Sequence, residues 1–296
     1  MELVAFDVAS TMLGDTILNP NELISDPLFV VGLILIGLIV GVAIGLSGLG
    51  GAPLLLPSLV LIGIPPQLVI GADLAFIFGT KLFASILHSK ERNVNWQALI
   101  FLLLPIVPMM ILASWVWTDI KENYGSDTLD TVILLFLGAI LVGVSLYMIK
   151  SNVLKNNRKE DEEFSNAVSR KFTKDEKTIF LGAGSIISFI TQITATGAGA
   201  MTLPILVKKC HCPPKHVAGT SVLFGVAISA VGTILHYNMG NMPIFLVLFL
   251  LIGSIPGVFF GVRLASKISP KKLIVLFSVI ILIAAIFLIS RGLGII

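Results

Sequence analysis

Charged residues are scarce in this sequence. Asp, Glu, Lys and Arg make up 12% of its 296 residues, whereas about a quarter of a soluble domain is charged. Hydrophobic residues reach 56%, and the mean hydropathy is +1.00. So few charges exclude an ordinary soluble domain. The basic residues of the linker 151–177 are mixed with acidic ones, which indicates a solvated connector and not a surface for a nucleic acid. The composition therefore predicts an integral membrane protein, surrounded by the lipid bilayer.

Basic residues are absent before Lys81, while five acidic residues fall within the first 26 positions. A secretory signal peptide opens with a positively charged region, so this absence argues against one. We expect residues 1–27 to stay on the chain as a short extracytoplasmic arm.

Cysteine is nearly absent as well, since Cys210 and Cys212 are the only two. Two cysteines are too few for a disulfide framework, and we expect both to be reduced in a cytoplasmic loop. His211 and His216 complete a group of metal-ligand types, but Cys-x-Cys is not a standard zinc spacing. The sequence therefore predicts no metal centre.

Ten apolar runs account for most of the chain. The runs at 53–64 and 200–208 are short, which suits half-helices or re-entrant segments that are buried in protein or line a water-filled cavity. The others approach the roughly 20 residues that a helix needs to cross the hydrocarbon core. They cover 28–46, 67–88, 97–117, 129–149, 178–195, 215–237, 243–264 and 272–290. The pattern predicts an all-α polytopic membrane protein.

Basic residues indicate which side of the membrane is cytoplasmic. If the first two runs return the chain to its starting side and each later run crosses once, 17 of the 20 Lys and Arg residues share one face. The positive-inside rule assigns that face, with the charged linker 151–177, to the cytoplasm. Both termini are then extracytoplasmic, in a multi-pass protein of the inner or plasma membrane. Trp96, Trp115 and Trp117 suit interfacial aromatic belts.

Two stretches of the sequence repeat one another. In each, a cluster of small residues interrupts an apolar run and is followed by Leu-Pro, with Pro57 and Pro204 separated by 147 residues. Five further pairs follow at a separation of 148, namely Pro65 with Pro213, Pro66 with Pro214, Gly71 with Gly219, Phe76 with Phe224 and His88 with His236. The expected sidedness makes the two halves, 28–150 and 178–296, inverted repeats of five segments each.

The small-residue clusters predict a binding site for an anion. Glycine permits a break in the helix and close approach of the backbone, and the half-helix that follows presents free N–H groups at the positive end of its dipole. Inversion brings both N-termini to the bilayer midplane. The residues expected around the anion are Ser47, Gly48, Gly50, Gly51, Gln192, Thr194, Thr196, Gly197 and Gly199. Close helix packing through glycine is the alternative for either cluster taken alone.

Two ionisable residues lie within the third run. Asp73 and Lys81 are eight residues apart, about 12 Å along a helix, so they do not pair directly. Their counterparts in the second half are Ser221 and Ser229. Lys81 is a candidate to attract the anion, and Asp73 is a candidate to carry a coupling proton. The alternatives are that Lys81 extends to the membrane interface and that Asp73 lies close to it.

His88 and His236 end equivalent runs on opposite sides of the membrane. Histidine titrates near neutral pH, so both residues are candidates for gating or for sensing pH. A histidine at the end of a helix also caps the last carbonyl groups, and this alternative stays open.

Several of these features together resemble one known family. They are the two breaks followed by Leu-Pro, the run Gly219-Thr-Ser221 that opens a helix, and His88 before Asn93-Val-Asn-Trp96. The sequence resembles the TauE/SafE sulfite exporter family over about residues 28–290. The resemblance implies a transporter of small sulfur-containing anions, such as sulfite, thiosulfate or an organosulfonate such as sulfoacetate. It implies no tightly bound cofactor and leaves the direction of transport open.

The resemblance also extends the expected site. It implies that the matching positions in both breaks, 47–51 and 194–199, bind the substrate. It adds Thr220 and Ser221, which lie on a helix after the second break. The chain departs from its own second copy at Asp73 and Lys81, which puts the choice of substrate and the coupling ion in question. We expect alternating access around the central site, and homo-oligomers are left open.

Two other functions fit parts of the sequence. An anion channel shares the fold and differs only in its flux kinetics. Gly45 to Gly48 also matches the Gly-x-Ser-Gly of rhomboid intramembrane proteases, with His236 as a base for Ser47. The repeat places Thr194 at the position of Ser47, where a threonine has no separate catalytic role. We therefore predict a transporter and not an enzyme.

Overall fold

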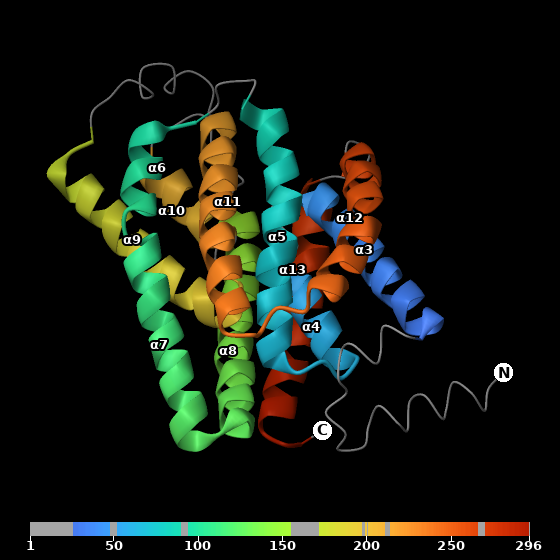
Figure 1. Cartoon of the computed structure of the whole chain (residues 1–296). Coiled ribbons are helices and arrows are strands. Elements are labelled where there is room, and N and C mark those ends of the chain that lie inside the picture. Colours follow the sequence, from blue (N-terminus) through green and yellow to red (C-terminus); the bar gives the residue numbers. More distant parts are fainter. Residues whose placement is uncertain are drawn as a thin grey trace.

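The computed structural model describes residues 26–47, 52–89, 94–154, 172–196, 199, 201–210, 214–265 and 270–295. Its first half contains α3 (Pro27–Ser47), α4 (Ala52–Leu61), α5 (Pro66–Ser89), α6 (Trp96–Leu103), α7 (Ile106–Tyr124) and α8 (Ser126–Leu154). Its second half contains α9 (Lys174–Thr194), α10 (Thr202–Lys209), α11 (Pro214–Asn238), α12 (Ile244–Ala265) and α13 (Pro270–Gly292). Figure 1 shows these helices as one bundle.

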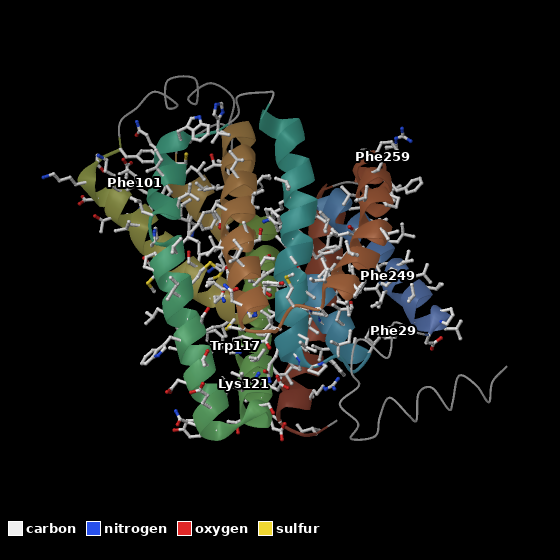
Figure 2. The ribbon with its side chains drawn as sticks, viewed as in Figure 1. Phe29, Phe101, Trp117, Lys121, Phe249 and Phe259 are labelled. Carbon is white, nitrogen blue, oxygen red and sulfur yellow. The ribbon has the colours of Figure 1, made fainter. Side chains whose placement is uncertain are left out.

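The prediction of an all-α polytopic membrane protein is confirmed. The described residues contain no strand, and seven helical stretches among them are long and apolar enough to cross a bilayer. Exposed large hydrophobic side chains are frequent on the outer surface, and Phe259 on α12, labelled in Figure 2, is 55% exposed. An apolar exterior is what contact with lipid requires.

Two short helices stand where the sequence predicts half-helices. α4 has 10 residues and α10 has eight, which is too short to cross a bilayer at 1.5 Å per residue. α9 ends at Ala195, a non-glycine residue in the left-handed conformation with φ 54°. Because an L-residue rarely adopts this conformation, Ala195 marks a sharp end to the helix. Each short helix therefore begins a few residues after a longer one ends.

α3 and α12 lie side by side and run parallel to each other (Figure 1). Five glycines line their contact, namely Gly37 and Gly41 on α3, and Gly253, Gly257 and Gly261 on α12. A Cβ atom at any of them would collide with a backbone carbonyl oxygen of the other helix. Small residues at intervals of four are a common way to bring membrane helices this close.

The same contact recurs between α9 and α6. Gly184 of α9 faces the carbonyl oxygen of Leu102, just as Gly37 of α3 faces that of Leu250. The two glycines are 147 residues apart and the two leucines 148, which are the separations of the sequence repeat. This recurrence agrees with two structural repeats, while their inverted relation stays a prediction.

α5 and α11 form the centre of the bundle and are antiparallel (Figure 1). Gly71 near the start of α5 lies against His236 near the end of α11, and Lys81 lies against Gly225 further along the pair. α8 and α13 form the third main pair. Neighbouring helices of the two halves are thus in contact throughout the bundle.

The buried apolar side chains form two main cores. One lies between α3, α4, α5, α8, α12 and α13, and the other between α6, α7, α9, α10 and α11. α9 contributes Ile187 to the second core, while Ala195 at its end belongs to the first. The end of α9 therefore passes from one core to the other.

Candidate functional site

The last part of α9, from Ile187 to Ala195, runs between the two cores and is polar. We call this segment the passage of α9. Between Ile187 and Ala195 the helix carries Ser188, Thr191, Gln192 and Thr194, each with 0% of its surface exposed. Buried polar groups in a membrane protein are costly unless they are hydrogen-bonded. Four of them over two turns of one helix mark this passage as the leading candidate for a functional site.

A hydrogen-bonded network ties this part of α9 to α7 and α11. The Gln192 side-chain amide donates to the Ser114 hydroxyl on α7 at 2.8 Å, and His236 Nε2 lies 3.1 Å from the Gln192 backbone oxygen. Trp117 packs edge-on against the His236 ring, with 5.1 Å between ring centroids. Trp117 and Lys121, both on α7, are labelled in Figure 2.

His236 and Trp117 take positions that the sequence only partly predicts. His236 is fully buried and contacts a carbonyl oxygen in the last turn of α9, which fits the carbonyl-capping alternative. Trp96 and Trp115 are 64% and 67% exposed, as expected of belt residues, but Trp117 is 2% exposed. The interpretation of Trp117 as an interfacial residue is therefore wrong, because its ring packs inward against His236.

The second break follows directly after this network. The Thr194 hydroxyl donates to the Ile190 oxygen at 2.8 Å, and the Thr196 hydroxyl donates to the Thr194 oxygen at 2.9 Å. Both threonines are buried. Gly199 accepts a hydrogen bond from the Leu203 N–H at 3.2 Å, at the start of α10. The structure thus brings Gln192, Thr194 and Thr196 together near the N-terminus of a half-helix.

Asp73 and Lys81 are both on α5, and Lys81 lies between α5 and α11. Asp73 is fully buried, and neither of its carboxylate oxygens has a hydrogen-bond partner among the described residues. The depth of Asp73 in the bilayer does not follow from this burial, so both interpretations of Asp73 stay predictions. The Lys81 ammonium lies where a Cβ atom of Gly225 would be, so the missing side chain of Gly225 makes room for the lysine.

The hydrogen bonds of Thr220 lie at the start of α6 and do not include residues of the α9 network. The Thr220 hydroxyl accepts from the Asn95 N–H at 2.9 Å and donates to the His216 oxygen at 2.6 Å. Asn95 in turn caps α6 by accepting from the Ala98 N–H. Thr220 thus anchors the start of α6, and Ser221 is buried beside it.

Several expected site residues lie outside the described residues. They are Gly48, Gly50, Gly51 and Gly197, together with the side chains of Ser47 and His88. The first break is therefore known only through its flanks, the end of α3 and the start of α4 at Ala52. Their part in binding stays a prediction.

The cysteine and histidine group offers no metal site within the described residues. Cys210 is buried at the end of α10 and is disulfide-bonded. The expectation that Cys210 is reduced is therefore wrong, and Cys212 and His211 lie outside the described residues. A sulfur atom in a disulfide is no longer a thiolate, which is the form that ligates zinc.

The sequence interpretation missed four residues around the passage of α9. Ser114, Trp117, Ser188 and Thr191 all lie on long apolar runs, where a single hydroxyl or indole is unremarkable. The available signal was the spacing of Ser188, Thr191 and Gln192, which places all three on one face of a helix. Arg291 of α13 was also missed, and its guanidinium donates to the Val60 oxygen at the end of α4.

Comparison with known proteins gives consistent results. A family model described as sulfite exporter TauE/SafE matches residues 33–288. The chain is 30% identical over 265 residues to the probable membrane transporter protein YjnA of Bacillus subtilis, covering 88% of this chain and 99% of that protein. It is 27% identical to the probable membrane transporter protein MJ0441 of Methanocaldococcus jannaschii, covering 86% and 94%. A further relative, YunE of Bacillus subtilis, is 24% identical, covering 85% and 93%. No solved structure matches.

Proposed function

The chain belongs to the sulfite exporter TauE/SafE family of membrane transporters, and from this premise we propose that it carries small sulfur-containing anions across the cell membrane. Sulfite, thiosulfate and organosulfonates such as sulfoacetate are the proposed substrates. Transport proceeds by alternating access around one central site. No cofactor or metal takes part.

One observation carries this proposal. α9 ends in a buried polar passage, and four of its side chains there are fully buried between two apolar cores. The half-helix α10 begins at Thr202, seven residues after Ala195. Its N-terminus therefore follows the same break. Free backbone N–H groups at the start of a helix suit an oxyanion.

The proposed site joins both breaks. On the second, Gln192, Thr194, Thr196, Gly197 and Gly199 contact the anion. On the first, the contacts come from Ser47, Gly48, Gly50 and Gly51, and α4 supplies a second helix N-terminus. Lys81 adds a positive charge from α5, and Asp73, His88 and His236 serve coupling or gating. Thr220 and Ser221 complete the set that family resemblance suggests.

The geometry of His236 argues against an intramembrane protease. Its Nε2 atom contacts the Gln192 backbone oxygen, and its ring packs edge-on against Trp117. A catalytic base must instead reach the nucleophile directly. An anion channel remains the second candidate, and saturable exchange with counterflow would favour the carrier.

The first test is binding of an anion panel to the purified protein. We expect sulfite, thiosulfate or sulfoacetate to raise the melting temperature in proportion to the logarithm of its concentration, because a ligand that binds only the folded state stabilises it. Sulfate, acetate and chloride serve as comparison anions. Calorimetry on the same samples gives the dissociation constant.

Gly197→Val provides the matched variant for this test. A branched side chain in the break removes backbone freedom and blocks close approach of an anion. We expect the variant to express normally and to lose both the thermal shift and transport. Normal flux in Gly197→Val and in the equivalent Gly50→Val would show that the breaks are not the site.

Lys81→Ala is expected to weaken anion affinity by about tenfold, because a hydrogen bond or close approach to a charged partner contributes on this scale. Gly225→Ala offers a milder version, since its Cβ displaces the end of a flexible lysine and not the backbone. Both variants should fold normally. Unchanged anion affinity in both variants would contradict a part of Lys81 in binding and would favour the alternative that Lys81 extends to the membrane interface.

A further inference from the structure

The two halves differ along one equivalent stripe. In the first half, Gly37, Gly41 and Gly45 of α3 lie against α12. The residues 147 positions later are Gly184, Ser188 and Gln192 of α9. Gly184 keeps the close contact with Leu102 of α6. The next two positions replace glycine with polar side chains, so the close glycine contact of α3 is not continued along α9.

Two hydroxyl groups on this face of α9 are left without partners. Serine and threonine within a helix normally donate to the carbonyl oxygen four residues earlier. On α9, Thr178, Ser185 and Thr194 do so, at 2.8 to 3.0 Å. Ser188 and Thr191 are fully buried and have no hydrogen-bond partner among the described residues. Their hydrogen-bonding capacity is therefore not used within the described residues.

Further unpartnered polar atoms surround the same stretch. The Gln192 side-chain oxygen, His236 Nδ1 and Trp117 Nε1 are buried, and none has a hydrogen-bond partner within the described residues. They come from α9, α11 and α7, which the contacts between Gln192, Ser114 and His236 hold together. Several buried polar atoms in one region are expected to bind water or a ligand.

We propose that Ser188, Thr191 and Gln192 form a hydrogen-bonding track for the oxygen atoms of the transported anion, leading from the break towards the start of α9. This proposal rests on the proposed function and names where the anion travels on one side of the site. The hydroxyl groups donate to the anion, and the Trp117 N–H extends the set of donors at the break.

The chemistry of the track suits an anion that must also leave. Its groups are neutral, so they bind the oxygen atoms of an anion less tightly than a fixed Arg or Lys would. A path through a membrane has to bind well enough to admit a solute and weakly enough to release it. α3 has no hydroxyl or amide side chain before Ser47, so the track exists only in the second half.

The test compares hydroxyl groups on the same helix. Ser188→Ala, Thr191→Val and the double variant remove the unpartnered groups, while Ser185→Ala and Thr178→Val remove hydroxyls that bond to the backbone. Uptake of radiolabelled thiosulfate and sulfite is measured in proteoliposomes containing the full-length protein. Melting temperatures are measured on the same preparations.

We expect the uptake of both anions to fall about tenfold in each single variant and further in the double variant, because each loses a hydrogen bond to a charged ligand. Melting temperatures should stay level or rise, since an unsatisfied buried hydroxyl is removed. Ser185→Ala and Thr178→Val should transport like the unmodified protein. A merely structural hydroxyl would give the opposite signs, with lower melting temperature and normal uptake per folded molecule.

Two outcomes separate the track from the proposed function. If the unmodified protein transports these anions and the double variant matches Ser185→Ala, the track is overturned and the function stands. If the unmodified protein neither binds nor transports any sulfur oxyanion, the function fails and the track fails with it.

Discussion

Gly253→Val is expected to keep α3 and α12 apart and to leave little folded protein. A Cβ atom at Gly253 would collide with the carbonyl oxygen of Ile34, and a backbone oxygen cannot rotate aside as a side chain can. Overpacking usually costs 1–3 kcal/mol, and we expect about 3 kcal/mol or more because two backbones must separate. The yield of monodisperse protein and its melting temperature in detergent measure the effect.

Gly32→Val and Gly143→Val are the controls for this prediction. Both glycines are in helices long and apolar enough to cross a bilayer, but apart from their own helix's backbone no described atom lies within 4 Å of the position that their Cβ would take. The added side chains therefore meet open space or lipid, and both variants should fold like the unmodified protein. Equal melting temperatures for Gly253→Val and Gly32→Val would contradict the close contact of α3 and α12.

Asp73→Asn is expected to abolish the dependence of transport on pH while leaving the protein as stable as before. Asp73 is fully buried without a hydrogen-bond partner among the described residues. A carboxylate in such a place is costly when charged, which makes Asp73 the candidate for the coupling proton. Asparagine keeps the shape and removes the titration. Flux measured from pH 5 to 8, together with the melting temperature, checks both parts.

Asp127→Asn is the matched control, because Asp127 is exposed in the first turn of α8. It should leave both the pH profile and the rate of transport intact. Lys81 on the same helix is the charged group that acts on Asp73, and His236 faces the start of α5. A pH profile retained in Asp73→Asn would exclude this residue and direct attention to His236.

The helices themselves were predictable from the sequence. A helix that crosses a bilayer has to be apolar over about 20 residues, and nine of the ten runs each match one observed helix. The run at 97–117 is instead divided into two helices, since α6 ends at Leu103 and α7 begins at Ile106. The half-helices were predictable too, because 53–64 and 200–208 are too short to cross. The pairing of α3 with α12 was not, since it depends on glycines in two segments some 200 residues apart fitting one another.

The site was predictable only in part. Gln192, Thr194 and Thr196 follow from the repeated small-residue clusters, and the structure brings them together at the end of α9. Ser188 and Thr191 were missed because a hydroxyl in a membrane helix usually bonds to its own backbone. Only the positions of the neighbouring atoms reveal that these two do not. Trp117 was misplaced because exposed and buried tryptophans look alike in an apolar run.

The contact between α3 and α12 also determines when the bundle can assemble during synthesis, because it cannot form until α12 has been made. α3 is among the first segments to leave the ribosome, and α12 follows roughly 200 residues later. At a synthesis rate of about 5–20 residues per second, that interval is on the order of 10–40 s. Throughout it, the glycine face of α3 has no partner and meets lipid or other inserted segments. Insertion and assembly are therefore separate events in time, and a chain arrested within the linker 151–177 would hold an inserted α3 whose partner does not yet exist.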